Sequence, residues 1–189
     1  MSGKLRYFPH LAGSLVLVGA GVLGLLNKWE PDHENPGLVY PDTLAGGLPT
    51  VCNGITKHVT DEPLILGDVW SAERCAEVEG RAIEKGQVAL AWCFKRLPPQ
   101  SVFDAASSHA HNVGMANTCA SRAMGLFNEG RWREGCLALS RAPNGTRVWA
   151  SVKTGKRLTN GKPEYREVRG LGLRRDDETA HCLGGLGHA

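Results

Sequence analysis

Two carboxylates and a hydroxyl stand at even spacing in a segment that could carry acid–base chemistry. Glu34 precedes Asp42 by eight residues, and Thr50 follows Asp42 by the same step. Two carboxyl groups are the minimum equipment for hydrolysing a glycosidic bond: one donates its proton to the leaving oxygen, and the other activates water or stabilises the oxocarbenium-like charge. A nearby hydroxyl such as that of Thr50 could orient the attacking water. The alternative interpretation is structural, because Asp is a common turn residue.

The elements that must position these groups can be read from the hydrophobic pattern. Residues 40–59 predict short strands around the turns LAGG and NG. An apolar stripe at spacings of three and four predicts an amphipathic helix from Ser71, its N-cap, to Cys93. We also expect helices over 102–113, 116–127, 130–140 and 171–183, with Ser101 and Asp104 as a capping pair, and a loop or irregular ribbon over 143–165. The predicted fold class is α+β, with a small β lobe and a larger helical lobe.

The first thirty residues contain an uncharged run, LAGSLVLVGAGVLGLL at 11–26, with basic residues before it and acidic residues after it. The pattern is similar to a signal sequence, but no small-x-small cleavage site follows, so we expect an uncleaved membrane anchor over residues 1–27 and a folded domain over 28–189. The anchor is weak, because it has four glycines and fewer residues than the ~20 that span a bilayer comfortably. The basic flank predicts that the N-terminus stays inside. The alternative is a buried core helix.

Composition limits the class of protein. The chain has 189 residues, 42% hydrophobic and 22% charged, which is typical of a globular protein. A net charge of +3 suits an anionic partner such as a cell-wall polymer or a membrane surface, or else is an ordinary mixed surface. No basic run with interleaved aromatics indicates nucleic-acid binding. We expect no cofactor and no metal, since the histidines, including the HAH at 109–111, show no metal-ligand spacing.

Six cysteines are compatible with disulfides in an exported chain and with buried thiols otherwise. They contain no CxxC pair, which argues against a zinc cluster. Cys75 and Cys93 share one helix face about 27 Å apart, so they cannot bond to each other. The sequence leaves the remaining choice among 15 pairings of six cysteines open.

Several ordered motifs resemble one known family. Glu34, Tyr40, Asp42 and PTVCNGIT, followed by LPPQSVFDAASSHAHNVG and GLGLRRDDETAHCL, are similar to the phage-type lysozymes, the muramidases of glycoside hydrolase family 24. The resemblance implies a lysozyme-like fold over about residues 28–185, with Glu34 as general acid, Asp42 as general base or charge-stabilising carboxylate, and Thr50 holding the water. The Glu-to-Asp step is one residue shorter than the family's usual one, so Glu30 is the alternative acid. The turn between Asp42 and Thr50 is longer than is usual in the family.

The resemblance also implies a substrate and a location. The weak anchor matches the signal-anchor-release endolysins of this family, which implies peptidoglycan as substrate. Such a chain would sit in the bacterial inner membrane through residues 11–26, with its catalytic domain in the periplasm, until it is released. We expect it to act as a monomer. The alternatives are a membrane-tethered murein-binding protein without catalysis, a lytic transglycosylase, and a secreted lysozyme with a cleaved signal.

Overall fold

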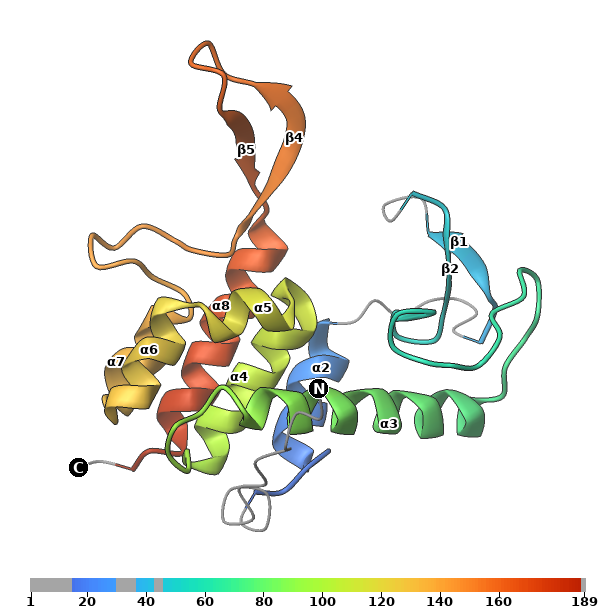
Figure 1. The fold of residues 1–189 in the computed structure, drawn as a ribbon, viewed down its shortest axis with the longest axis horizontal. Helices are drawn as coiled ribbons and strands as arrows, with labels where there is room; N and C mark the ends of the chain where they lie inside the picture. The colour runs from blue at the N-terminus through green and yellow to red at the C-terminus, as the bar shows by residue number, and fades with distance from the viewer. Residues whose placement is uncertain (1–14, 30–36, 43–45, 188–189) are drawn as a thin grey trace, which may run out of the picture.

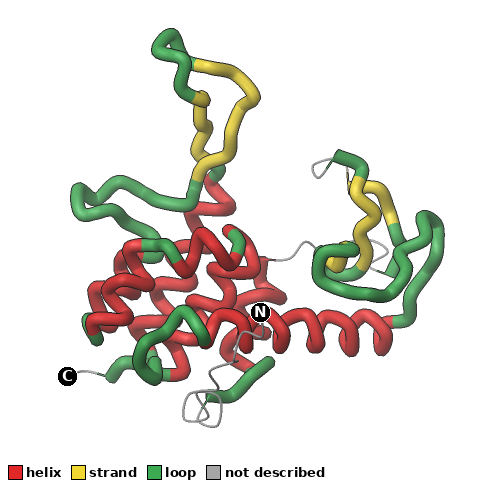
Figure 2. Tube along the Cα trace, viewed as in Figure 1, coloured by secondary structure: helices red, strands yellow, loops and turns green. Residues whose placement is uncertain are grey.

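The computed structural model describes residues 15–29, 37–42 and 46–187, and it divides them between a small β lobe and a larger helical lobe (Figures 1 and 2). Glu30 and Glu34 lie outside these described residues. One long helix, α3, runs from the β lobe into the helical lobe (Figure 1). This arrangement confirms the predicted α+β class and the two-lobe organisation.

The β lobe is built on a three-stranded antiparallel sheet in the order β1-β2-β3, formed by Tyr40–Asp42, Leu48–Val51 and Ile55–Thr56. This is the small β element that residues 40–59 predict. The lobe has its own apolar core, in which α3 takes part. Its buried members are Val39, Val51, Cys52, Ile55, Trp70, Cys75 and Val78.

Helix α3 (Ala72–Ala91) begins where the sequence predicts. The Ser71 side chain accepts a hydrogen bond from the backbone N–H of Arg74 at 3.2 Å, which satisfies one of the free donors of the first turn. The apolar stripe of the helix divides between two cores: Cys75 packs in the β lobe, and Leu90 packs in the helical lobe. One amphipathic helix therefore fixes the distance between the lobes.

Helix α4 (Gln100–Val113) is the centre of the helical lobe. Its residues 102–110 are all buried, because α2, α3, α5 and α8 contact it from several sides. The remaining helices of this lobe are α5 (Met115–Cys119), α6 (Arg122–Glu129), α7 (Trp132–Ala138) and α8 (Arg169–Gly184).

Two details of the helical prediction were wrong. The expected helix 116–127 is two helices, because the Ser121 side chain caps α6 by accepting from the N–H of Met124 at 3.1 Å. The expected capping pair does not form: α4 starts two residues earlier, at Gln100, and Ser101 instead donates to the Cys182 carbonyl at 3.1 Å. In the second case a long-range contact to α8 competes successfully with the local cap.

Helix α2 (Ala20–Trp29) packs against α4 and buries Val22, Leu25 and Leu26. A Cβ atom at Gly21 would overlap Oδ2 of Asp104 and come within 3.0 Å of its Cγ, so only glycine allows this close approach. In this structure the residues of α2 thus pack as a core helix of the helical lobe. Among the described helices, none has the length and apolar character needed to cross a bilayer.

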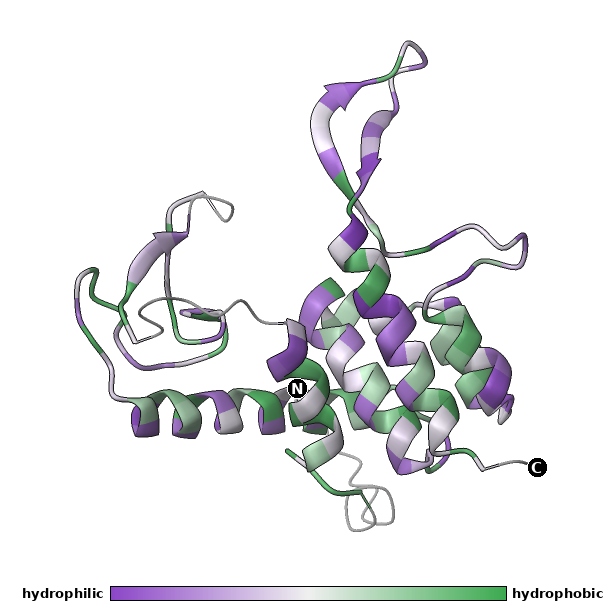
Figure 3. Ribbon diagram, turned by 180° about the vertical axis from the view of Figure 1, so that it is seen from behind, coloured by the Kyte–Doolittle hydropathy of each residue, from purple (hydrophilic) through white to green (hydrophobic). Residues whose placement is uncertain are grey.

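Residues 151–167 form a hairpin where the sequence predicts a loop or ribbon. Strands β4 (Ser151–Arg157) and β5 (Pro163–Glu167) pair in antiparallel fashion and project from the helical lobe (Figure 1). Both strands are hydrophilic over most of their length (Figure 3). The strands escaped prediction because neither buries a face, so no apolar alternation marks them.

All six cysteines form disulfides, in the pairs Cys52–Cys75, Cys93–Cys119 and Cys136–Cys182. The first joins the sheet to α3, the second joins the end of α3 to α5, and the third joins α7 to α8. The exclusion of a Cys75–Cys93 bond is confirmed. Disulfides of this kind persist in oxidising compartments, in agreement with an exported chain.

Candidate active site

A cavity of about 480 Å³, which we call the interlobe cavity, lies where the two lobes meet. Its walls come from the end of α2, the turn after β2, the end of α4 and the start of α8. The lining residues are Trp29, Gly54, His111, Asn112, Val168, Gly170, Leu171 and Arg174. A neighbouring cavity of about 330 Å³, between α2, α3 and α4, is lined mainly by apolar side chains. The first cavity suits a hydroxyl-rich ligand better, because it offers imidazole, amide and guanidinium groups.

The β lobe holds Asp42 and Thr50 on one face of its sheet. Asp42 pairs with Leu48 and Tyr40 pairs with Thr50, so the Asp42 and Thr50 side chains are diagonal neighbours on the same side. Thr50 is 2% exposed, and its hydroxyl donates to the Leu48 carbonyl at 3.0 Å. The half-buried Asp42 ends β1, where its carbonyl accepts from the N–H of Gly47 at 2.7 Å.

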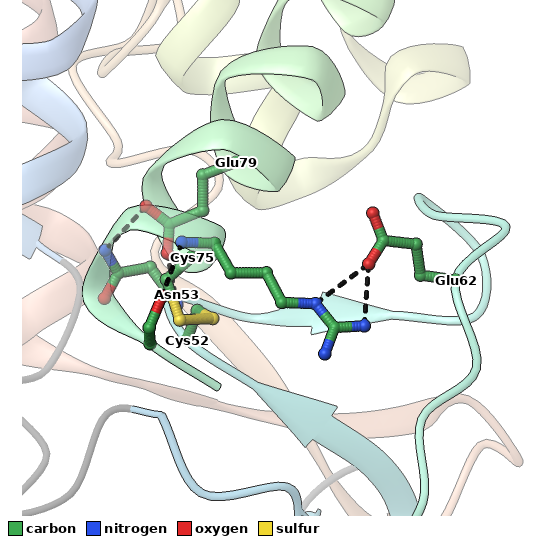
Figure 4. Close-up of a disulfide and its surroundings, with 7 residues drawn as sticks. Cys52, Asn53, Glu62, Cys75 and Glu79 are labelled. Carbon is green, nitrogen blue, oxygen red and sulfur yellow. Dashed lines mark hydrogen bonds and ion pairs between the residues drawn. A yellow bond between two sulfur atoms is a disulfide. The ribbon is translucent and has the colours of Figure 1, made fainter. Parts of the chain in front are cut away.

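The turn that brings Gly54 to the cavity is fixed by contacts with α3 (Figure 4). The Cys52–Cys75 disulfide anchors its first residue. Next to it, the Asn53 backbone N–H donates to Glu79 Oε1 at 2.8 Å, and the Asn53 amide donates to Glu79 Oε2 at 3.3 Å. Gly54 follows with φ +83°, a conformation that favours glycine. The turn formed by Asn53 and Gly54 is therefore a rigid part of the cavity wall.

A buried ionic cluster lies under the cavity, between α4 and α8. Glu178 accepts a hydrogen bond from Arg175 Nη2 at 2.7 Å and another from the Ser108 hydroxyl at 2.8 Å. All three side chains are essentially inaccessible to solvent. Burial raises the pKa of Glu178, while Arg175, Ser108 and Arg174 act in the opposite direction. Such a cluster gives a defined geometry to the start of α8, which forms one wall of the cavity.

His109 belongs to the same buried layer but stays neutral. Its Nδ1 lies 2.9 Å from the Thr118 hydroxyl, and its ring meets Trp149 edge to face. Burial lowers the pKa of His109 to about 3, and the positive charges of Arg175 and Arg174 contribute. The group is therefore a packing histidine with one hydrogen bond, and its neutral form is part of the core.

The structure brings together some of the predicted site residues. Asp42 and Thr50 share a sheet face of the β lobe but are not among the residues that line the cavity. Glu34 and its alternative Glu30 lie outside the described residues. Two cavity residues were not predicted as site residues from the sequence: His111, considered there only as a metal ligand within HAH, and Arg174 of α8. The i,i+4 spacing of Arg174 and Glu178 was a usable signal, since it places both on one helix face.

Known proteins match the chain over most of its length. A family model described as phage lysozyme matches residues 37–178. The SAR-endolysin of Pseudomonas phage phiKMV is 28% identical over 137 residues, which cover 72% of this chain and 73% of that protein.

Two solved structures show the same fold at low sequence identity. The endolysin from Escherichia coli O157:H7 phage FAHEc1 superposes with a TM-score of 0.69 at 22% identity, covering 92% of this chain and 98% of the endolysin. The active form of the P1 phage endolysin Lyz gives a TM-score of 0.62 at 22% identity, covering 94% of this chain and 91% of Lyz. With a lysozyme-like fold, an interlobe cavity and the family match in place, the chain belongs to the phage lysozyme family and is a peptidoglycan hydrolase.

Proposed function

We propose that this enzyme is an endolysin that hydrolyses the β-1,4 bond between N-acetylmuramic acid and N-acetylglucosamine in peptidoglycan. In this proposal Glu34 protonates the glycosidic oxygen as the bond breaks, and Asp42 activates water or stabilises the developing positive charge on the sugar. Thr50 helps to hold the water. The observation that carries the assignment is the placement of Asp42 and Thr50 as diagonal neighbours on one sheet face of the lobe that borders the cavity.

Chain connectivity supports Glu34 as the partner of Asp42. Glu34 follows Trp29, which lines the cavity, by five residues, and it precedes Gly37 of the β lobe by three. Glu30 follows Trp29 directly, so it remains the alternative acid.

The test compares single substitutions in the full chain. We expect Glu34→Gln and Asp42→Asn each to lower the release of reducing ends from purified peptidoglycan by at least ~100-fold, while Glu30→Gln stays close to wild type. Loss of activity in Glu30→Gln alone would move the acid to Glu30. Anhydro-muramic products and an active Asp42→Asn variant would point to a transglycosylase, and binding without products would point to a murein-binding protein.

Truncation before residue 27 is a poor substitute for these variants, because it would delete Val22, Leu25 and Leu26 from the helical lobe. The segment is also held by polar contacts. Gln100 bonds both the N–H and the carbonyl of Val16, at 2.9 and 3.0 Å, and Gln87 accepts from the N–H of Val18 at 2.7 Å.

We further propose that residues 11–26 are a weak signal anchor in the inner membrane, with the enzyme domain in the periplasm, and that the docked α2 belongs to the released form. The uncharged run and the likeness to the phiKMV SAR-endolysin support this. Gly24→Leu tests it, because leucine makes the apolar run more hydrophobic at an exposed position where an added Cβ would meet no atom within 4 Å. We expect more membrane-bound enzyme and later lysis. An unchanged membrane fraction would argue against the anchor.

A further inference from the structure

The β4–β5 hairpin concentrates the positive charge of the whole chain. Residues 151–169, which we call the basic hairpin, contain six Lys or Arg residues and two Glu residues. Their net charge is therefore +4, whereas the full chain carries +3, so all other residues together sum to −1. The mild basicity of this protein is a local property of one projecting element.

The positive charges of the basic hairpin are available to a partner. Its two acidic residues are already engaged, since Glu164 accepts from the Thr154 hydroxyl at 2.6 Å and Glu167 lies 3.8 Å from Arg147. Arg157 donates to the Gly161 carbonyl. Among the described residues, no carboxylate lies within ion-pair distance of the other five basic side chains of this element, all of which are exposed. These side chains are Lys153, Lys156, Lys162, Arg166 and Arg169.

The basic hairpin also begins at the wall of the candidate active site. β5 ends at Glu167, and Val168, Gly170 and Leu171, which follow it, line the interlobe cavity. β4 has seven residues, so the hairpin reaches about 23 Å from this wall at 3.3 Å per residue. Figure 1 shows it projecting from the end of the helical lobe where α8 begins. A polymer seated in the cavity would therefore pass close to the hairpin.

We propose that the basic hairpin is an electrostatic arm that binds the free carboxylates on the peptide stems of peptidoglycan, while the glycan strand lies in the cavity. This inference rests on the proposed function and adds a second contact region to it. The charges are complementary, and Tyr165, 57% exposed, stands opposite Lys153 and offers a flat ring beside a cation. A membrane surface is a poorer fit, because the turn 158–162 contains only one apolar residue, Leu158, to insert into lipid.

The test removes three charges from the hairpin of the full chain. Lys153→Gln, Lys156→Gln and Arg166→Gln are combined, and binding to insoluble peptidoglycan is measured by co-sedimentation in 50 and 300 mM NaCl. We expect the half-saturating protein concentration to rise roughly five- to tenfold at low salt and to differ less than about twofold at high salt. KM for peptidoglycan should rise in parallel with kcat unchanged.

Two matched variants separate charge from shape and position. Lys85→Gln, Lys95→Gln and Arg133→Gln remove the same charge from exposed sites outside the basic hairpin, and this triple variant should bind like the wild type. The charge-preserving variant Lys153→Arg, Lys156→Arg and Arg166→Lys should also bind like the wild type. Equal weakening by the control triple would overturn the proposal, because it would reduce the effect to net charge.

Two further substrates identify the bound group. The first is peptidoglycan whose carboxylates have been converted to amides. We expect the wild type to bind this material as weakly as the hairpin variant binds unmodified peptidoglycan. Equal wild-type binding to both materials would overturn the proposal. So would a hairpin variant that loses binding to phosphatidylglycerol vesicles but keeps binding to peptidoglycan, since the arm would then be a membrane contact. Failure of the wild-type enzyme to release reducing ends would refute the proposed function without affecting these binding results.

Discussion

The close approach of Gly21 to Asp104 gives a prediction whose magnitude can be worked out. Asp104 is 4% exposed, and its carboxylate is fixed by Gln100 Nε2 at 2.7 Å and faces His181 Nε2 at 3.4 Å. A methyl group at position 21 would overlap this carboxylate, whose partners prevent it from moving freely. Forcing an extra carbon into such a site costs about 1–3 kcal/mol. Gly21→Ala should therefore destabilise the fold.

Gly24→Ala provides the matched control. Both glycines lie in α2, so both substitutions gain the same helix-propensity term of up to about 1 kcal/mol, and both change the apolar run 11–26 by one methyl group. At Gly24 the new Cβ would meet no atom within 4 Å. The difference in unfolding free energy between the two variants thus isolates the overlap with Asp104, and we expect about 1–3 kcal/mol.

The assay is guanidinium denaturation of the oxidised full chain, followed by circular dichroism, with Tm as a second readout. For a chain of this size 1 kcal/mol corresponds to about 2–4 °C, so Gly21→Ala should melt roughly 4–8 °C below Gly24→Ala for a difference of about 2 kcal/mol. Equal stabilities would refute the reasoning, because they would mean that α2 does not dock on Asp104 in solution.

Three more predictions concern the buried layer, the turn and the disulfides. His109 takes up a proton near pH 6.5 in the unfolded state but only near pH 3 in the folded state. Lowering the pH from 7 to 5 should therefore remove about 2 kcal/mol of stability. In urea denaturation, His109→Gln should show a correspondingly smaller dependence of stability on pH. Glu79→Ala removes both acceptors of Asn53 and should cost about 1 kcal/mol of stability in the same assay. Glu77 is exposed, so Glu77→Ala should cost less than about 0.5 kcal/mol. Equal costs would contradict the assigned role of Glu79. Replacing Cys136 and Cys182 by Ala removes a disulfide that spans 46 residues and should cost about 4 kcal/mol through loop entropy. The loss is measured as a lower Tm in the absence of reductant. An unchanged Tm would show that the disulfide does not constrain the unfolded chain.

Local patterns were sufficient for the elements that bury one face. The three- and four-residue stripe of α3 and the Ser71 cap depend on residues within a few positions of each other, and both were confirmed. The short strands around Asp42 were also confirmed, because their turns need glycine at positive φ and the sequence supplies it at Gly46, Gly47 and Gly54. The spacing of Asp42 and Thr50 then placed both side chains on one sheet face once the hairpin register was known.

By itself, then, the sequence determined the α+β class, most helices and strands of both lobes, and the family resemblance that the matched residues 37–178 confirm. Only the tertiary structure decided which cysteines pair, that His109 and Glu178 share a buried layer, and that Gly21 must lie against Asp104. These contacts are between residues that are far apart in the chain, and the local periodicity of side chains does not reveal which distant residues become neighbours. The basic hairpin is the clearest example. It buries no face, so its sequence has no apolar alternation, and its strands are recognised only from their backbone pairing in the structure.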